Sequence, residues 1–232
     1  MFTGIAVAEN LIRAGVARRV LVVSGEYISY LATFAQRTIE NEFDSRLPCL
    51  TLGDAGAAVL LGGTSRTDVG FQEVDLRTLS QHSQLCIAKL TQQGPIMFTD
   101  MLGVSSAITQ HGLEHWLRTA QRRGWSLADV QHMIPHQVSQ TTIVSGLNEL
   151  RKVVGDEFRE EIVISNIAER GNTASTSHWV AVWDHARAGR IRSGDNVIFG
   201  VSGSGITVGT GLYRFDDLPD RLREDGPANG NG

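Results

Sequence analysis

Two stretches of the sequence follow the same plan. "LIRAGVARRVLVVSGE" (residues 11–26) and "HARAGRIRSGDNVIFGVSG" (residues 185–203) each contain the end of a helix at Arg-Ala-Gly, a short basic connection, an apolar strand and then Ser-Gly. A second strand of small and β-branched residues follows each stretch, in "DAGAAVLLGG" and "GITVGTGLYRF". A repeated helix-and-strand unit indicates duplication within the chain. The sequence therefore predicts an α/β fold built from two similar halves.

The first of these units begins with an unusual helix. Apolar residues recur at helical spacing over residues 2–12, and they occupy nearly every side of that helix. Such a pattern predicts a central helix, because a surface helix keeps one polar face. The run Val20 to Val23 that follows is continuously apolar, which predicts a strand covered on both faces.

The other elements are predicted from periodicity and turn residues. Residues 27–48 read as irregular, residues 78–96 give little signal, and residues 216–232 are charged and then rich in Pro, Asn and Gly, which predicts a disordered tail. Helices are expected at 101–124, 138–154 and 174–188. Strands are expected at 57–61, in "VGFQEVDLRTL", in "EIVIS", and as two strands joined at a Gly-Ser-Gly turn in "NVIFGVSGSGITVGTGLYRF".

Charge and composition exclude several classes of function. The 232 residues carry a net charge of −4 with no block of Lys and Arg, which argues against a nucleic-acid partner. No apolar run reaches the length of a membrane span, and the first residues lack the basic region of a signal peptide. Two cysteines, Cys49 and Cys86, make no disulfide framework. A cytoplasmic protein without a membrane partner is the expectation.

Two polar residues stand where a strand gives way to a helix. His136 follows "MIP", and Asn172 follows Gly171 after "EIVIS". Taken singly, each has a structural interpretation: a histidine at a helix start bonded to the backbone, and an asparagine N-cap. Together, a neutral imidazole and a carboxamide can each donate a hydrogen bond to one oxygen, which stabilises an enolate or a thioester oxyanion. The small residues "TAST" beside Asn172 would leave room for a substrate.

A glycine-rich turn supplies a third candidate. Gly203, Ser204 and Gly205 lie in "GVSGSGITVG", where backbone N–H groups can approach a ligand oxygen closely. A simple strand turn is the structural interpretation. The segment does not match G-x-S-x-G, G-x-G-x-x-G or the P-loop pattern, so a serine hydrolase and a nucleotide-binding protein lose support.

Two other constellations are weaker. "HGLEH" at residues 111–115 matches H-x-x-E-H, so a zinc hydrolase using His111 and His115 is a further hypothesis, but no third ligand follows and an exposed helix face explains the pattern better. Cys49, expected within a strand, and Cys86 lack a cationic neighbour that would activate a thiolate, so both are expected to be structural.

Four motifs in order resemble one family. "GDAGAAVLL", "IPHQ", "GNTAS" and "FGVSGSGITVGTGLYRF" look like β-ketoacyl-acyl-carrier-protein synthase III, a family of the thiolase superfamily. Elongating synthases have a second histidine where this chain has Asn172, and thiolases carry a late cysteine where it has Ser204. Plant-type polyketide synthases and hydroxymethylglutaryl-CoA synthase share the Cys-His-Asn logic and remain as neighbours.

The resemblance implies a five-layered αβαβα fold with two duplicated halves. Residues 1–68 would be the remainder of the N-terminal half and residues 69–215 the C-terminal half. It also implies a cytoplasmic homodimer that takes an acyl group from acyl-CoA onto a cysteine and condenses it with malonyl-acyl-carrier protein, without cofactor or metal. By the resemblance, His136 and Asn172 hold the thioester oxygen during decarboxylation, and the turn at Gly203–Gly205 contributes to the oxyanion hole.

The sequence also departs from the family. The nucleophilic cysteine of the family, in a Cys-x-Gly setting, precedes the helix that "MFTGIAVAEN" resembles, so it would fall just ahead of Met1. The chain would then lack the front of the fold and be inactive alone. After His136 the family shows Gln-Ala-Asn and soon a basic residue for carrier docking, whereas this chain has Gln137-Val138-Ser139. Specialised metabolism is therefore as well supported as fatty-acid synthesis, and the alternative is a complementing subunit paired with a cysteine-bearing chain.

Overall fold

A mixed four-stranded sheet forms the centre of the fold. The computed structural model describes residues 1–92 and 94–224. The strands lie in the order β3-β8-β7-β6, with β6 parallel to β7 and the other neighbours antiparallel. Their bounds are β3 (Gly70–Thr78), β6 (His132–Pro135), β7 (Asn196–Gly203) and β8 (Thr207–Arg214).

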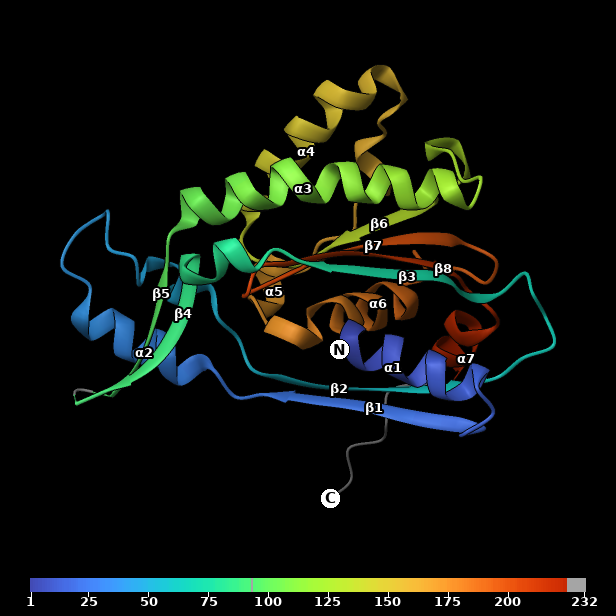
Figure 1. The fold of residues 1–232 in the computed structure, drawn as a ribbon, viewed down its shortest axis with the longest axis horizontal. Helices are drawn as coiled ribbons and strands as arrows, with labels where there is room; N and C mark the ends of the chain where they lie inside the picture. Colours follow the sequence, from blue (N-terminus) through green and yellow to red (C-terminus); the bar gives the residue numbers. More distant parts are fainter. Residues whose placement is uncertain (93, 225–232) are drawn as a thin grey trace.

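Helices cover both faces of this sheet (Figure 1). On one face lie α3 (Met101–Arg122) and α4 (Gln140–Val154). On the other lie α1 (Phe2–Arg13) and α6 (Ser177–Arg187), and beyond them an antiparallel ribbon of β1 (Arg19–Glu26) and β2 (Ala55–Gly62). The remaining elements are α2 (Ser29–Thr38), β4 (Cys86–Thr91), β5 (Gly94–Thr99), α5 (Ile167–Arg170) and α7 (Leu218–Glu224).

The repeated sequence plan corresponds to a repeated structure. In the first unit α1 ends before Gly15, and β1 then pairs antiparallel with β2. In the second, α6 ends before Gly189, and β7 pairs antiparallel with β8. Both glycines have positive φ, 71° and 75°, a conformation that glycine adopts without a Cβ clash. The predicted pair of similar α/β units is confirmed.

The core lies on both faces of the central sheet. Between the sheet and the middle helices, Phe2 and Ile5 of α1 pack with Phe199 of β7, and all three are nearly inaccessible to solvent. On the opposite face, Leu150 of α4 packs with Ile198 of β7. Because β7 contributes buried side chains to both clusters, it is held rigidly between two helical layers. Its end leads into the glycine-rich turn.

The ribbon β1–β2 has only one covered face, which corrects the prediction for residues 20–23. Leu21, Val23 and Leu60 are 59%, 66% and 64% exposed, whereas Val22 packs into the core. Val7 on the outer side of α1 is also exposed, so that helix is not buried on every side. The helical layer expected outside the ribbon is not present among residues 1–92 and 94–224. Apolar side chains of β1 and β2 point to both faces of the ribbon, but the described residues bury only one face.

Four further expectations differ from the structure. Residues 29–38, expected to be irregular, form α2, with Leu31 and Ala35 buried on one side. The segment with little signal contains the hairpin β4–β5. "EIVIS" forms no ladder, only a bridge between Met133 and Val163. The tail expected to be disordered from Asp216 includes helix α7, packed against α6, while residues 225–232 lie outside the described residues.

Over residues 1–92 and 94–224, every helix is too short or too polar to cross a bilayer.

Substitutions in β1 should distinguish its two faces. We expect Val22→Ala to lower the free energy of unfolding by about 1–2 kcal/mol, because its methyl groups pack against α1 at Gly4. Leu21→Ala should change it by no more than about 0.5 kcal/mol, because that side chain is exposed. Urea unfolding followed by circular dichroism would measure both. An equal loss in the two variants would show that the outer face is covered in solution.

Candidate active site

A cavity of about 600 Å³ lies where the start of α1 meets the end of β7 and the hairpin β4–β5. His136 and Asn172, the two residues singled out from the sequence, both line it. Gly203 and Ser204 line it as well. Much of the remaining wall is apolar and includes Ile28, Leu31, Leu52, Met97, Val104 and Ile108. The cavity therefore combines a few polar groups with a wall suited to a hydrocarbon.

His136 is fixed by the strand before it and by two hydrogen bonds. It follows β6 directly, and its backbone N–H donates to Gly200 O of the neighbouring strand β7 at 2.9 Å. Its Nδ1 lies 2.8 Å from Ser177 Oγ at the start of α6. When the serine hydroxyl donates to Nδ1, the proton of the neutral ring resides on Nε2. The ring then presents an N–H donor at Nε2.

Burial keeps this imidazole neutral. Desolvation lowers the pKa of His136 to about 4. A neutral donor suits a site where an oxygen gains negative charge during reaction, because the ring stabilises that charge without itself losing a proton.

The carboxamide of Asn172 has a defined orientation. Its Oδ1 accepts a hydrogen bond from Ala174 N at 3.0 Å, which assigns the oxygen and leaves the Nδ2 donors without a partner among the described residues. Asn172 is not the N-cap of α6, since Thr176 occupies that position. The N-cap interpretation is therefore wrong, and the amide N–H groups are available to a ligand in the cavity.

The backbone at Asn172 is locked to the segment that directly precedes β2. Asn172 N donates to Thr51 O at 2.6 Å, and Gly53 N donates to Asn172 O at 3.0 Å. This close approach requires glycine: a Cβ on Gly53 would lie 2.4 Å from Arg170 O, and Gly171 has φ of +68°. Gly171 of "GNTAS" and Gly53 of "GDAG" thus both allow this backbone contact.

A strained residue follows Asn172. Ala174 has φ of +45°, the only positive value at a non-glycine residue over residues 1–92 and 94–224. Such a conformation is costly and persists only where surrounding contacts enforce it. Ser175 provides them: its N–H and hydroxyl both donate to Glu26 Oε1 at the end of β1, and its Oγ lies 2.6 Å from Ser24 Oγ. These small polar residues therefore hold one wall of the cavity in place through hydrogen bonds to β1.

The glycine-rich turn and Cys86 form another part of the wall. Gly203 ends β7, and Gly205 has φ of +125° in the turn to β8, although Gly205 does not itself line the cavity. The Ser204 hydroxyl donates to Cys86 Sγ at 3.1 Å. Cys86 lines the cavity, a placement that sequence reasoning missed because β4 gave no clear pattern. Cys49 is 2% exposed in a 3₁₀ turn rather than a strand, and burial raises its pKa.

His178 is the second residue that sequence reasoning missed. It is 3% exposed in the first turn of α6, and it lines the cavity beside His136. The two rings are 5.8 Å apart with 25° between their planes. Its position directly after Ser177 was visible in "TASTSHW", but a helical pattern alone does not show which side of a helix start faces a cavity.

The zinc hypothesis for "HGLEH" finds no site in the described residues. His115 faces the central sheet: its Nδ1 lies 2.9 Å from Thr210 Oγ1 of β8, and its Nε2 lies 3.5 Å from Asp75 Oδ1 of β3. The expectation of a simple exposed helix face is therefore wrong for this segment. His111 instead neighbours His82. Over residues 1–92 and 94–224, no three His, Cys, Asp or Glu side chains are placed to hold a metal ion.

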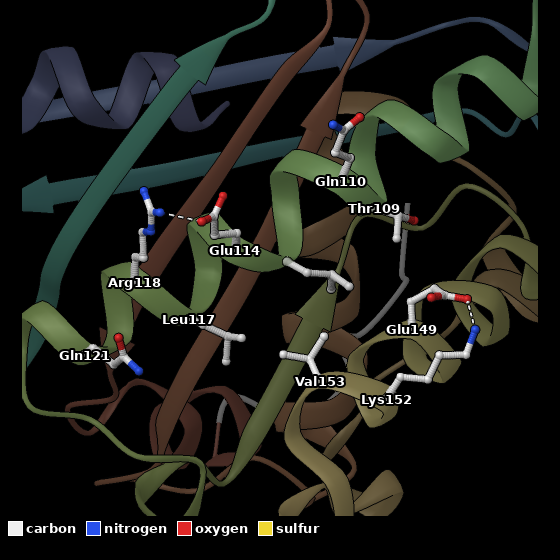
Figure 2. A pocket seen from close by; sticks show the side chains of 10 residues that line it. Thr109, Gln110, Glu114, Leu117, Arg118, Gln121, Glu149, Lys152 and Val153 are labelled. Carbon is white, nitrogen blue, oxygen red and sulfur yellow. Dashed lines mark hydrogen bonds and ion pairs between the residues drawn. The ribbon is translucent and has the colours of Figure 1, made fainter.

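A second hollow, of about 390 Å³, lies between α3 and α4 (Figure 2). Its charged side chains are paired within each helix, Glu114 with Arg118 and Glu149 with Lys152. None of the sequence-predicted site residues lines it. Exposed pairs of this kind contribute little and indicate no particular ligand.

Comparison with known proteins assigns the class that this fold and cavity define. Residues 1–80 match the model of 3-oxoacyl-[acyl-carrier-protein (ACP)] synthase III, and residues 120–215 match the model of its C-terminal domain. The chain belongs to the 3-oxoacyl-[acyl-carrier-protein] synthase III family.

The relatives are longer than this chain. β-Ketoacyl-[acyl-carrier-protein] synthase III 2 of Streptomyces coelicolor is 31% identical over 217 residues, which are 89% of this chain and 58% of the relative. The synthase III of Rhodospirillum centenum is 28% identical over 222 residues, 91% of this chain and 63% of the relative. The chain therefore spans about 58–63% of the length of these relatives.

Solved structures support the thiolase fold. The synthase III of Pseudomonas aeruginosa PAO1 superposes with a TM-score of 0.76 at 24% identity, covering 93% of this chain and 64% of that one. OleA of Xanthomonas campestris with bound lauric acid and lauroyl-CoA superposes with a TM-score of 0.77 at 20% identity, covering 92% and 63%.

Titration of His136 tests its environment. We expect half-protonation at about pH 4, because burial opposes the charged ring. Since this pKa lies below the ordinary 6.5, the unfolded chain binds more protons between those pH values, and the free energy of unfolding should fall as the pH is lowered through that window. Proton NMR of the histidine rings measures the first effect and urea unfolding the second. A midpoint near the ordinary value would contradict the buried placement.

Proposed function

We propose that the chain forms part of an acyltransferase of the synthase III type, which joins an acyl thioester to a malonyl thioester by decarboxylative Claisen condensation. One observation carries the proposal: His136 and Asn172 line the same cavity, and neither His136 Nε2 nor Asn172 Nδ2 has a hydrogen-bond partner among the described residues. Membership of the synthase III family supports the same chemistry.

The proposed chemistry uses these donors at one oxygen. In the malonyl thioester the bond to the carboxylate breaks, CO₂ leaves, and the electron pair forms an enolate whose charge lies largely on the thioester oxygen. His136 Nε2–H and Asn172 Nδ2–H donate to that oxygen. The enolate carbon then attacks the acyl thioester carbonyl, and the thiolate of the acyl-enzyme departs. The turn at Gly203–Gly205 offers a backbone N–H to the second oxyanion.

The acyl-enzyme requires a cysteine that we place just ahead of Met1 in the complete protein. Met1 lines the cavity at the N-terminus of α1, where the helix dipole lowers a thiol pKa and favours the thiolate. Cys49 is unsuited to this role, because burial raises its pKa.

The apolar wall supports an acyl chain as the group transferred. Ile28, Leu31 and Met97 contribute to it, and a similar fold, OleA, has been solved with lauric acid and lauroyl-CoA. We propose acyl-CoA as acyl donor, malonyl-acyl-carrier protein as extender, and a cytoplasmic homodimer as the working form. No cofactor enters the reaction.

A complementing subunit is the second candidate function. The exposed Leu21, Val23 and Leu60 form an apolar face on the ribbon β1–β2 that another polypeptide could cover. In that case a partner chain would bring the cysteine to the start of α1. Co-expression with a chain carrying the cysteine-bearing front of a synthase would give a stable complex under this hypothesis and none under the first.

Removing either donor should impair decarboxylation. In the protein that carries the nucleophile, we expect His136→Ala and Asn172→Ala each to lower the rate of malonyl thioester decarboxylation by about 10²–10³-fold, the loss typical of one oxyanion donor. Release of labelled CO₂ measures it. His185→Ala, a partly buried histidine of α6 outside the cavity, is the control and should leave the rate near normal. Unaltered rates in both site variants would remove the assignment.

The 232 residues alone should not condense substrates. Without a cysteine thiolate at the start of α1, no acyl-enzyme can form, so we expect no β-ketoacyl product from acyl-CoA and malonyl thioester. Product analysis by mass spectrometry measures this. Sustained turnover by the isolated chain would show that a residue within it, such as Cys86, serves as the nucleophile.

A further inference from the structure

His178 holds a definite tautomer inside the cavity. Its Nε2 lies 3.0 Å from Gly200 O, and a carbonyl oxygen can only accept a hydrogen bond. The ring proton is therefore on Nε2, and Nδ1 carries a lone pair. The same carbonyl accepts the backbone N–H of His136, so both histidines are anchored to one point of β7.

The Nδ1 of His178 has no hydrogen-bond partner among residues 1–92 and 94–224. The described polar side-chain atoms that are sealed from solvent and unpartnered are His132 Nδ1, Thr173 Oγ1, Trp179 Nε1 and Asn196 Oδ1. Since His178 Nδ1 is not one of them and its ring lines the cavity, this nitrogen is open to the cavity contents. It is an acceptor, whereas His136 Nε2 and Asn172 Nδ2 are donors.

The surroundings of His178 show which part of a ligand reaches it. The centroid of the His178 ring lies 5.2 Å from that of Phe2 and 6.0 Å from that of Phe199, and both are core residues. His178 itself is 3% exposed. The ring is therefore held between the core and the cavity, with little access to bulk solvent. Its stacking on His136 places it close to the proposed position of the thioester carbonyl.

We propose that His178 Nδ1 accepts a hydrogen bond from a hydroxyl near the thioester, so that the site prefers a 3-hydroxyacyl group over the unsubstituted chain. This rests on the proposed function, since it assumes that an acyl thioester occupies the cavity. An ionised carboxylate, which can only accept, does not satisfy this nitrogen. A hydroxyl on C3 is a donor at short range from the carbonyl that His136 binds.

The test compares three probes, butyryl-CoA and the two enantiomers of 3-hydroxybutyryl-CoA, by isothermal titration calorimetry with the 232-residue chain. We expect one hydroxy enantiomer to bind about fivefold more tightly than butyryl-CoA, the difference typical of one neutral hydrogen bond. Equal affinities would overturn the inference, with water as the occupant at Nδ1, and would leave the proposed function standing. Binding of none of the three probes would count against the proposed function itself.

Two variants separate the nitrogen atoms of His178. His178→Gln keeps an N–H near Gly200 O and removes the acceptor at Nδ1, so the ratio of 3-hydroxybutyryl-CoA affinity to butyryl-CoA affinity should fall to about one. His178→Asn places an amide oxygen near the Nδ1 position, so the preference should remain. A preference that survives in His178→Gln would overturn the inference.

A measurement on the free protein decides the tautomer independently of any thioester. The nitrogen-15 shifts of the His178 ring at neutral pH should show a protonated Nε2 and an unprotonated Nδ1. A proton on Nδ1 would overturn the inference whatever the probes do, because the nitrogen would then be a donor.

Discussion

The hydrogen bond between His136 and Ser177 joins two corners of the fold that are far apart in sequence. One corner is the end of β6, and the other is the start of α6, in the segment that carries Asn172. The 2.8 Å contact between Nδ1 and Ser177 Oγ ties the ring to that segment, and a serine that donates to Nδ1 leaves the ring proton on Nε2. The remaining fastenings serve the same purpose: the Gly200 carbonyl holds both histidines, and Glu26 holds Ser175. The polar wall of the cavity depends on this joint.

The sequence predicted the parts of the fold whose signals are local. The repeated Arg-Ala-Gly units, the long helix that ends before Gly124 and the strands on either side of Ser204 all follow from periodicity and turn residues, and the structure contains them. It did not predict α2 or the hairpin β4–β5, because those segments have mixed polarity and owe their order to packing against each other. The strand expected in "EIVIS" is wrong because an apolar run can be buried without pairing as a strand. This run is buried next to Met133 through a single bridge.

The candidate site likewise has residues that the sequence predicted and residues that it did not. His136 stands at a strand-to-helix junction that sequence patterns mark well, whereas Asn172 stands between α5 and α6, not after a strand as expected. A family resemblance added the order of the two residues. His178, Glu26 and Cys86 carry no such mark, since each becomes part of the cavity only through the way α6, β1 and β4 are packed. The exposed face of β1–β2 shows a further limit: an apolar strand pattern predicts burial without saying which chain or segment provides the cover.

The central claim is that an imidazole N–H and a carboxamide N–H donate to one thioester oxygen. Infrared difference spectroscopy of butyryl-CoA labelled with carbon-13 at the carbonyl, bound to the protein, observes that oxygen directly. We expect the bound carbonyl stretch to lie below its frequency in water, and to recover part of the shift in His136→Ala and a further part when Asn172→Ala is added. A carbonyl frequency that is the same in the wild-type protein and in both variants would contradict the account.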